Sequence, residues 1–312
     1  MDNITHTLIG IGLAQAGLAQ RLGRGTTMIL AVASNLPDVD VACLAGGPLS
    51  FLWRRTLTHS LLGAVVLGLA ASVLFRRLYP NLTWTAVLGL TFLGIAGHVF
   101  ADLWNSYGVV LYWPFLWQRV DLDWVFILDL AIWAILGGTL AASLLARRHA
   151  VWIWRGGLVL LAGYVGLCTA AEHESERLLR NQTEANPAQP AAVFVYPEPF
   201  GPTRYRGVAR EGDYYSVYEI WPFQKRRELL ERLEIEAKTP VVDAARRSEA
   251  GRQLDRFLST PVWRTTPDGQ SALVYGLGFR TRLFRARTPF GFRVAPDGRV
   301  WREHSLAPAT AP

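Results

Sequence analysis

Long apolar runs fill roughly the first 170 residues, whereas the rest of the chain is polar, charged and rich in Pro and Arg. A helix needs about 20 consecutive apolar residues to cross a lipid bilayer, and several of these runs come close to that length. The composition agrees, because 51% of the residues are hydrophobic and only 18% are charged. We therefore expect a membrane domain followed by a soluble domain.

The expected fold is an α-helical multi-pass membrane domain of about six helices, followed by a small α+β soluble domain. The membrane domain covers residues 1–171, a linker covers residues 172–192, and the soluble domain covers residues 193–312. The expected membrane segments are residues 4–19, 27–44, 57–75, 85–104, 124–146 and 151–171. The second segment contains Pro37 and two aspartates, which indicates a broken or only partly inserted helix.

The soluble domain shows short strand patterns and two amphipathic helix patterns. Strands are expected at residues 192–196, 204–210, 214–221, 271–279 and 290–295. Helices are expected at residues 225–233 and 241–258. This domain has no recognisable catalytic motif, so the residues that indicate chemistry lie in the membrane domain.

Membrane topology explains the net charge of +7 better than nucleic-acid binding does. On six segments, the first, third and fifth connections carry the larger group of arginines, namely Arg21, Arg24, Arg76, Arg77, Arg147 and Arg148. The second and fourth connections carry Arg54, Arg55 and Arg119. The richer side is expected in the cytoplasm, which places the protein in the inner (plasma) membrane with its soluble domain on the periplasmic or outer side.

His98 and Asp102 are four residues apart inside an apolar stretch, so a helix would carry both side chains on one face. An imidazole and a carboxylate are costly in or beside a bilayer unless something uses them. Metal ligands of metalloprotease helices have a similar spacing. A buried structural hydrogen bond between the two side chains is the alternative interpretation.

Further acidic and imidazole side chains lie in similarly apolar surroundings. Asp38 and Asp40 follow a proline, where a carboxylate can also cap backbone amides. His6 and His59 each begin an apolar run, and either histidine could instead face lipid head groups. With six helices, all of these groups come to one membrane face together with Asp129, as a shared metal ion would require.

The segments that carry these residues resemble a known family. They are LPDVD at residues 36–40, LTHS at 57–60, GHVFAD at 97–102, NSYG at 105–108, WPF at 113–115 and DWVFILD at 123–129. The chain is similar in them to the YdjM-like inner-membrane proteins, for which a metal-dependent hydrolase activity is inferred. The soluble tail looks similar to that of the longer members, so the resemblance covers most of the chain.

The YdjM-like family is distantly similar to zinc-dependent phospholipases C, which hold catalytic zinc with clustered His and Asp ligands. The resemblance implies one metal shell made of Asp38 or Asp40, His59, His98 and Asp102. It also implies that His6 joins a second ion bridged by Asp102. The phospholipases use a further His with a Glu at helical spacing, and this chain shows no convincing pair of that kind. A full three-ion site is therefore in doubt, although Asp123 or Asp129 would be available as substitutes.

Two functions from different classes agree with these residues. The first is a membrane-embedded metal-dependent hydrolase in which zinc, or alternatively manganese, activates a water. Asp38 or Asp129 would act as the catalytic base, and the partner would be a membrane lipid whose ester or phosphoester is cleaved. The second is a non-enzymatic membrane scaffold or transport-like protein whose His and Asp side chains form structural hydrogen bonds.

Overall fold

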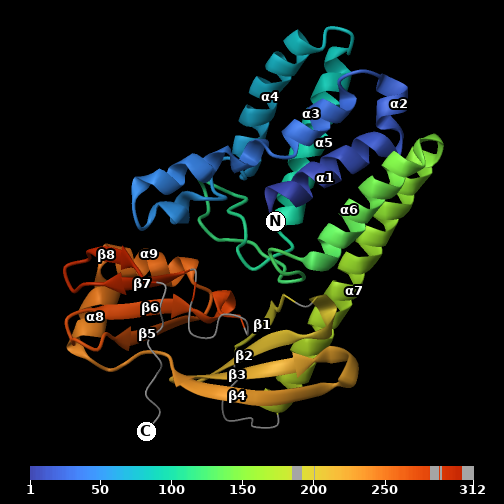
Figure 1. The fold of residues 1–312 in the computed structure, drawn as a ribbon. Coiled ribbons are helices and arrows are strands. Elements are labelled where there is room, and N and C mark those ends of the chain that lie inside the picture. The colour runs from blue at the N-terminus through green and yellow to red at the C-terminus, as the bar shows by residue number, and fades with distance from the viewer. Residues whose placement is uncertain (185–191, 200, 282–287, 289, 304–312) are drawn as a thin grey trace. The chain divides into compact units, whose positions relative to one another are not determined.

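The computed structural model describes residues 1–184, 192–199, 201–281, 288 and 290–303 (Figure 1). The chain divides into two compact units, each with its own internal packing. Unit 1 consists of Met1–Leu44, Trp53–Ala170 and Pro199–Gly201. Unit 2 consists of Ala45–Leu52, Ala171–Glu198 and Pro202–Pro312.

Unit 1 is helical. Its helices are α1 (Asn3–Leu13), α2 (Ala19–Leu22), α3 (Thr26–Ala33), α4 (Leu61–Leu78), α5 (Trp84–Asp102), α6 (Leu130–Leu145) and the first part of α7 (Ala150–Glu184). A π-helical turn joins α1 to α2, and a 3₁₀ helix (Leu36–Gly46) follows α3. Polar side chains fix where the helices start: Asp2, Ser60, Thr83 and Asp129 accept hydrogen bonds from the first amides of α1, α4, α5 and α6.

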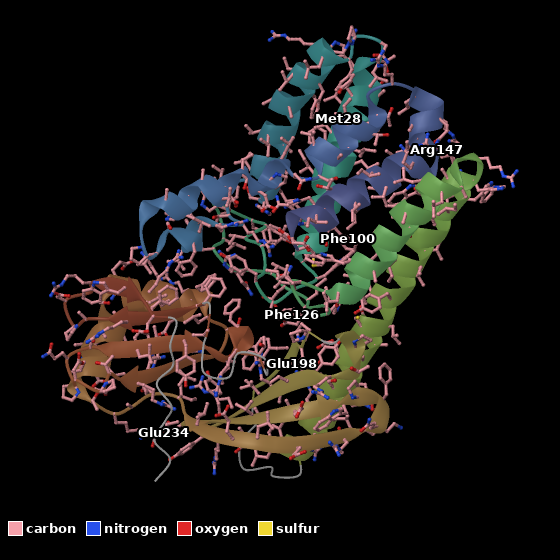
Figure 2. All side chains as sticks on the ribbon, viewed as in Figure 1. Met28, Phe100, Phe126, Arg147, Glu198 and Glu234 are labelled. Atoms are coloured by element: carbon pink, nitrogen blue, oxygen red, sulfur yellow. The ribbon has the colours of Figure 1, made fainter. Side chains whose placement is uncertain are left out.

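Four helical stretches of the described chain are long and apolar enough to cross a membrane. They are Thr26–Gly46, Leu61–Leu78, Trp84–Asp102 and Arg147–Asn181, and Leu130–Leu145 is a shorter apolar helix. Large apolar side chains such as Met28 and Phe100 are exposed on these stretches (Figure 2), as lipid-facing residues would be.

The expected count of six membrane helices is not confirmed. The first expected segment is interrupted at Gly17, whose φ of 138° lies outside the helical region. The fifth begins at Leu130 instead of residue 124, because the carboxylate of Asp129 caps the helix there.

Helices α3 and α5 approach closely at Gly94. A Cβ atom at Gly94 would lie 2.6 Å from the Cβ of Ala33 and 3.1 Å from the backbone nitrogen of Ser34. A Cβ atom at Gly89, on the same helix, would meet nothing within 4 Å. The glycine at position 94 therefore sets the distance between the end of α3 and α5.

We expect Gly94→Ala to lower the free energy of unfolding by about 1–3 kcal/mol, because the added methyl group overpacks this contact. Gly89→Ala is the matched control and should be neutral or slightly stabilising, since alanine favours a helix over glycine. Thermal unfolding of the two variants in detergent compares them. Equal stability of both would contradict the close contact.

Unit 2 contains two four-stranded antiparallel sheets. The first has the order β1 (Val193–Pro197), β2 (Tyr205–Glu211), β3 (Tyr214–Trp221) and β4 (Arg226–Glu234). The second has the order β5 (Pro261–Thr265), β6 (Ala272–Gly276), β7 (Gly291–Val294) and β8 (Val300–Arg302). Buried residues from both sheets, including Val217, Val262 and Tyr275, form one core.

The structure corrects several expectations for this unit. Residues 225–233, expected as a helix, are strand β4, which pairs with β3 through a register shift between Val217 and Tyr218. Residues 241–258 form two helices, α8 (Pro240–Arg247) and α9 (Glu249–Phe257), because Ser248 caps α9 and interrupts the run. Strands β5 and β8 were not expected.

Helix α7 continues beyond unit 1. The expected linker at residues 172–192 is helical as far as Glu184, and residues 185–191 lie outside the described part of the chain. Ala171 and Leu179 on this helix pack against Val195, Tyr205 and Ile220 of the first sheet. This part of α7 therefore contributes to the core of unit 2.

Candidate metal centre

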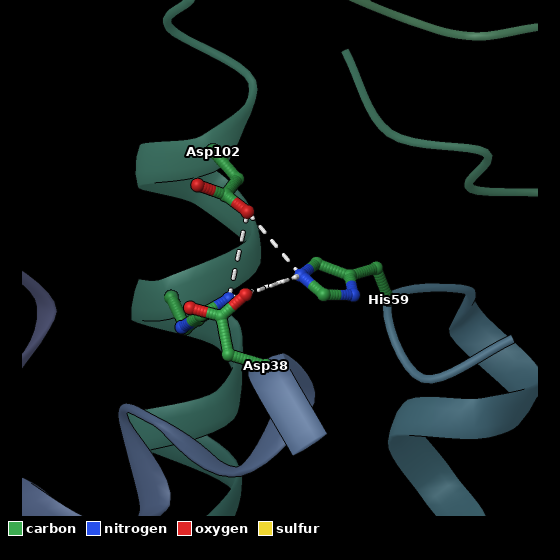
Figure 3. Close-up of side chains that lie close together, drawn as sticks. Asp38, His59 and Asp102 are labelled. Carbon is green, nitrogen blue, oxygen red and sulfur yellow. Dashed lines mark hydrogen bonds and ion pairs between the residues drawn. The ribbon is translucent and has the colours of Figure 1, made fainter. Parts of the chain in front are cut away.

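Asp38, His59, His98 and Asp102 form one buried group, although they come from three separate parts of the sequence. Asp38 lies on the 3₁₀ helix after α3, His59 lies just before α4, and His98 and Asp102 lie on the last two turns of α5. One ligand atom from each side chain lies within 4.8 Å of the others. Figure 3 shows Asp38, His59 and Asp102 pointing toward one another.

The hydrogen bonds of the two imidazoles decide which nitrogen faces the group. His98 Nδ1 lies 2.7 Å from the carbonyl oxygen of Ser34, which can only accept, so Nδ1 carries the proton. His59 Nδ1 lies 3.3 Å from Asp40 Oδ2 and 3.0 Å from Thr58 Oγ1, and the carboxylate favours a proton there too. In the neutral imidazoles, both Nε2 atoms are then acceptors, and they face each other at 3.1 Å.

Two carboxylate oxygens lie close to these Nε2 atoms. Asp102 Oδ2 lies 3.2 Å from His59 Nε2 and 3.5 Å from His98 Nε2. Asp38 Oδ1 lies 3.9 Å from His59 Nε2. Four acceptor atoms thus converge in a buried place, an arrangement that favours a cation among or beside them.

The spacing and chemistry of these four atoms fit a divalent metal ion. Two ligand atoms that are each about 2.1 Å from an ion, at a tetrahedral angle, are about 3.4 Å apart. The four separations given above between the acceptor atoms run from 3.1 to 3.9 Å. Two imidazoles and two carboxylates suit zinc, and manganese also accepts such a set.

Positive groups also contact both oxygens of Asp102, including Oδ2, which faces the two imidazoles. Arg55 Nε lies 2.8 Å from Asp102 Oδ2, and the amino group of Met1 pairs with Oδ1. His6 Nε2 lies 3.2 Å from Oδ1, and the His6 ring stacks on the His98 ring with 3.7 Å between centroids. His6, expected as a metal ligand, therefore contacts the second oxygen of Asp102 and lies next to the four-residue group.

Asp40, also expected as a ligand, contacts residues that lie next to the four-residue group. Its Oδ2 accepts the Arg55 backbone N–H at 2.7 Å and the Thr58 hydroxyl at 3.2 Å, in addition to facing His59 Nδ1. A carboxylate behind a ligating imidazole orients the ring and raises its basicity. Arg54 links the two aspartates, with Nη2 donating to Asp38 Oδ1 at 2.7 Å and Nε 3.4 Å from Asp40 Oδ1.

Asp129, expected as a catalytic base, makes its described contacts elsewhere. Its Oδ1 accepts the backbone N–H groups of Ala131 and Ile132 at the start of α6. The Tyr164 hydroxyl donates to its two oxygens at 3.0 and 2.8 Å. The structure does not bring Asp129 into the four-residue group, and its role as a base stays a prediction.

Arg55 was not expected to contact the four-residue group. Arg55 is almost fully buried, and besides Asp102 its guanidinium reaches the Asn105 side chain at 3.1 Å and the Met1 carbonyl at 3.2 Å. Tyr107 lies between Arg55 and Arg119, whose guanidinium carbons are 4.9 and 5.0 Å from its ring centroid. Burial lowers the pKa of Arg119 to about 10, so it stays cationic at neutral pH.

Known proteins share sequence with this chain. The family model described as "YdjM inner membrane protein" matches residues 1–174, which is more than half of the chain. The uncharacterized protein YfhP of Bacillus subtilis (strain 168) is 29% identical over 130 residues, which are 39% of this chain and 40% of YfhP. The match therefore spans less than half of that relative. No solved structure matches.

Proposed function

Because this chain belongs to the YdjM inner membrane protein family, we propose that it is a membrane-embedded, metal-dependent hydrolase. Asp38, His59, His98 and Asp102 would hold one divalent ion, with zinc as the first choice and manganese as the second. The substrate would be an ester or phosphoester of a membrane lipid, since the group lies at the ends of helices long and apolar enough to cross a bilayer.

One observation carries the proposal: two imidazole lone pairs and a carboxylate oxygen converge within 3.1–3.5 Å of one another. Each imidazole has its other nitrogen directed at an acceptor, so neither ring, when neutral, can supply the proton that the other would need. A divalent cation resolves this repulsion and uses every one of the lone pairs.

The residues around the ion would have separate tasks. A bound metal ion would supply a Lewis acid that lowers the pKa of a water, which would take a fifth position beside the four protein ligands. Ser34 and Asp40 hold the rings of His98 and His59 in place through their Nδ1 atoms. Asp38, whose Oδ1 Arg54 holds at 2.7 Å, would take a proton from the water through its other oxygen, Oδ2.

The direct test is the metal content of the detergent-purified protein, measured by elemental mass spectrometry. We expect about one zinc or manganese per chain, which a chelator removes and added metal restores. Metal-loaded protein would then be screened against lipid esters and phosphoesters, with the chelated protein as control. A well-folded protein that stays free of metal after metal is supplied would refute the proposal.

A second candidate has its own support in the contacts of Asp102. Arg55 and the Met1 amino group already pair with this carboxylate, as in a structural salt-bridge network without metal. The protein would then be a non-enzymatic scaffold or transport-like membrane protein. This candidate predicts no tightly bound metal ion.

We also propose that unit 2 lies on the periplasmic or outer side of the inner membrane. The arginine bias of the connections supports this orientation. A cysteine at the exposed position 270, in a background with Cys43 replaced by Ser, is expected to react with a membrane-impermeant thiol reagent in intact cells. Cys168 is buried and should stay unlabelled. Labelling of position 270 only after lysis would reverse the orientation.

A further inference from the structure

A loop rich in exposed aromatic side chains follows α5. Tyr112, Phe115, Leu116 and Trp117 are all exposed, and Phe115 leaves 83% of its surface uncovered. The ring of Trp117 packs edge-on against that of Trp53, which is also exposed, at 5.2 Å between centroids. Exposed apolar side chains gathered in this way indicate a surface that contacts something apolar.

This loop is tied to the segment that carries Arg54, Arg55 and His59. The Val110 N–H donates to the Arg55 carbonyl at 2.9 Å, and Arg119 Nη2 donates to the Arg54 carbonyl at 2.8 Å. The Leu61 N–H, at the start of α4, donates to the Leu111 carbonyl at 2.9 Å. The exposed rings therefore belong to the same local structure as the ligand group.

The loop also lies at one end of two candidate membrane spans. Helices α4 and α5 are joined by a short connection, so the start of α4 at Leu61 and the end of α5 at Asp102 lie at the same membrane face. The apolar surface that α4 exposes begins at Leu57, Leu61 and Leu62. The Leu61–Leu111 hydrogen bond makes the aromatic loop a continuation of this lipid-facing surface.

We propose that residues 112–117, together with Trp53, insert into the head-group layer of the bilayer on the face that carries the His/Asp group. Trp and Tyr prefer this layer, while Phe and Leu reach the acyl chains below it. The loop would thus hold the ligand group at head-group depth. A lipid ester would reach the group from the bilayer and not from water, a consequence that rests on the proposed function.

The insertion can be measured without any activity or metal. A spin label would be placed at position 115 in full-length protein with Cys43 replaced by Ser, reconstituted into phosphatidylethanolamine and phosphatidylglycerol vesicles. Two further labels serve as references for depth. Position 66, exposed midway along α4, represents the acyl chains, and position 270, exposed in unit 2, represents water. Buried Cys168 remains unlabelled. Collision rates with oxygen and with a neutral nickel chelate report the depth of each label.

The expected result is an oxygen-to-nickel collision ratio at position 115 well above that at position 270 and shifted toward that at position 66. A ratio at position 115 equal to that at position 270 would overturn the proposal and would point to a protein partner or a water-exposed loop. A water-like ratio at position 66 would overturn it as well, because α4 would then not face lipid. Absence of metal or hydrolysis would refute the proposed function alone and leave this result unaffected.

Discussion

Replacing His98 by Ala should weaken metal binding by at least about 100-fold, because it removes one of four converging ligand atoms and leaves the Ser34 carbonyl without its donor. Elemental mass spectrometry and a metal titration of the purified variant measure the loss. Hydrolytic activity should disappear together with the metal. His149→Ala is the control, since this exposed histidine at the start of α7 should not affect the metal content.

Asp102→Asn separates the two candidate functions. An amide retains the shape and one acceptor of the carboxylate but removes its charge. A metal centre should lose most of its ion in this variant. A salt-bridged scaffold has no ion to lose, and should show only the lower stability that follows from leaving Arg55 and the Met1 amino group without their carboxylate. Full metal content in both His98→Ala and Asp102→Asn would place the ion elsewhere in the molecule.

Asp40→Asn should have a smaller effect than either ligand variant. Asp40 faces His59 Nδ1 from behind, so its change should lower metal affinity by about 10–100-fold without abolishing binding. A loss as large as that of His98→Ala would instead make Asp40 a ligand, as the sequence pattern allowed.

The ligand group was largely visible in the sequence because its members are polar side chains in apolar surroundings. His98 and Asp102 could be paired from their spacing alone, since a helix places residues four apart on one face. His59 could be nominated as well, but Asp38 could not be separated from Asp40. The choice of ligands depends on which side-chain atoms face the four-residue group. Those orientations are fixed by tertiary contacts, such as the one between His98 Nδ1 and the Ser34 carbonyl, which the sequence does not reveal.

The errors in the fold have physical reasons. Strand β4 has the sequence RRELLERLE, whose charged residues favour a helix, and its pairing with β3 overrides that local preference. The polar part of α7 was interpreted as a linker although it contains helix-stabilising pairs. Glu174 pairs with Arg177, and Glu176 pairs with Arg180, at helical spacing. These pairs were the available signal for a longer helix.

Arg55 escaped notice because its partners are distant in the sequence. Arg54 and Arg55 resemble ordinary arginines at the end of a membrane segment. Only the fold brings the Arg55 guanidinium to Asp102, to Asn105 and to the carbonyl of Met1. Because these groups are buried, Arg55 contributes to the charge balance around Asp102.

Arg55→Met is therefore expected to lower the free energy of unfolding of the metal-free protein by about 3–5 kcal/mol, because it removes a buried positive charge from beside the buried Asp102 carboxylate. Thermal unfolding in detergent measures the change. Arg177→Met is the control: its ion pair with Glu174 is exposed and screened by water, so this change should leave the stability almost unaltered.

Added metal should restore part of the stability lost in Arg55→Met, since a divalent ion at the four-residue group would supply the missing positive charge. At about 100 times its dissociation constant, an ion that binds only the folded state adds about 2.7 kcal/mol. The same ion should stabilise the wild type but not His98→Ala. If Arg55→Met were as stable as the wild type without metal, Asp102 would not depend on this arginine, and the charge balance derived for the centre would be wrong.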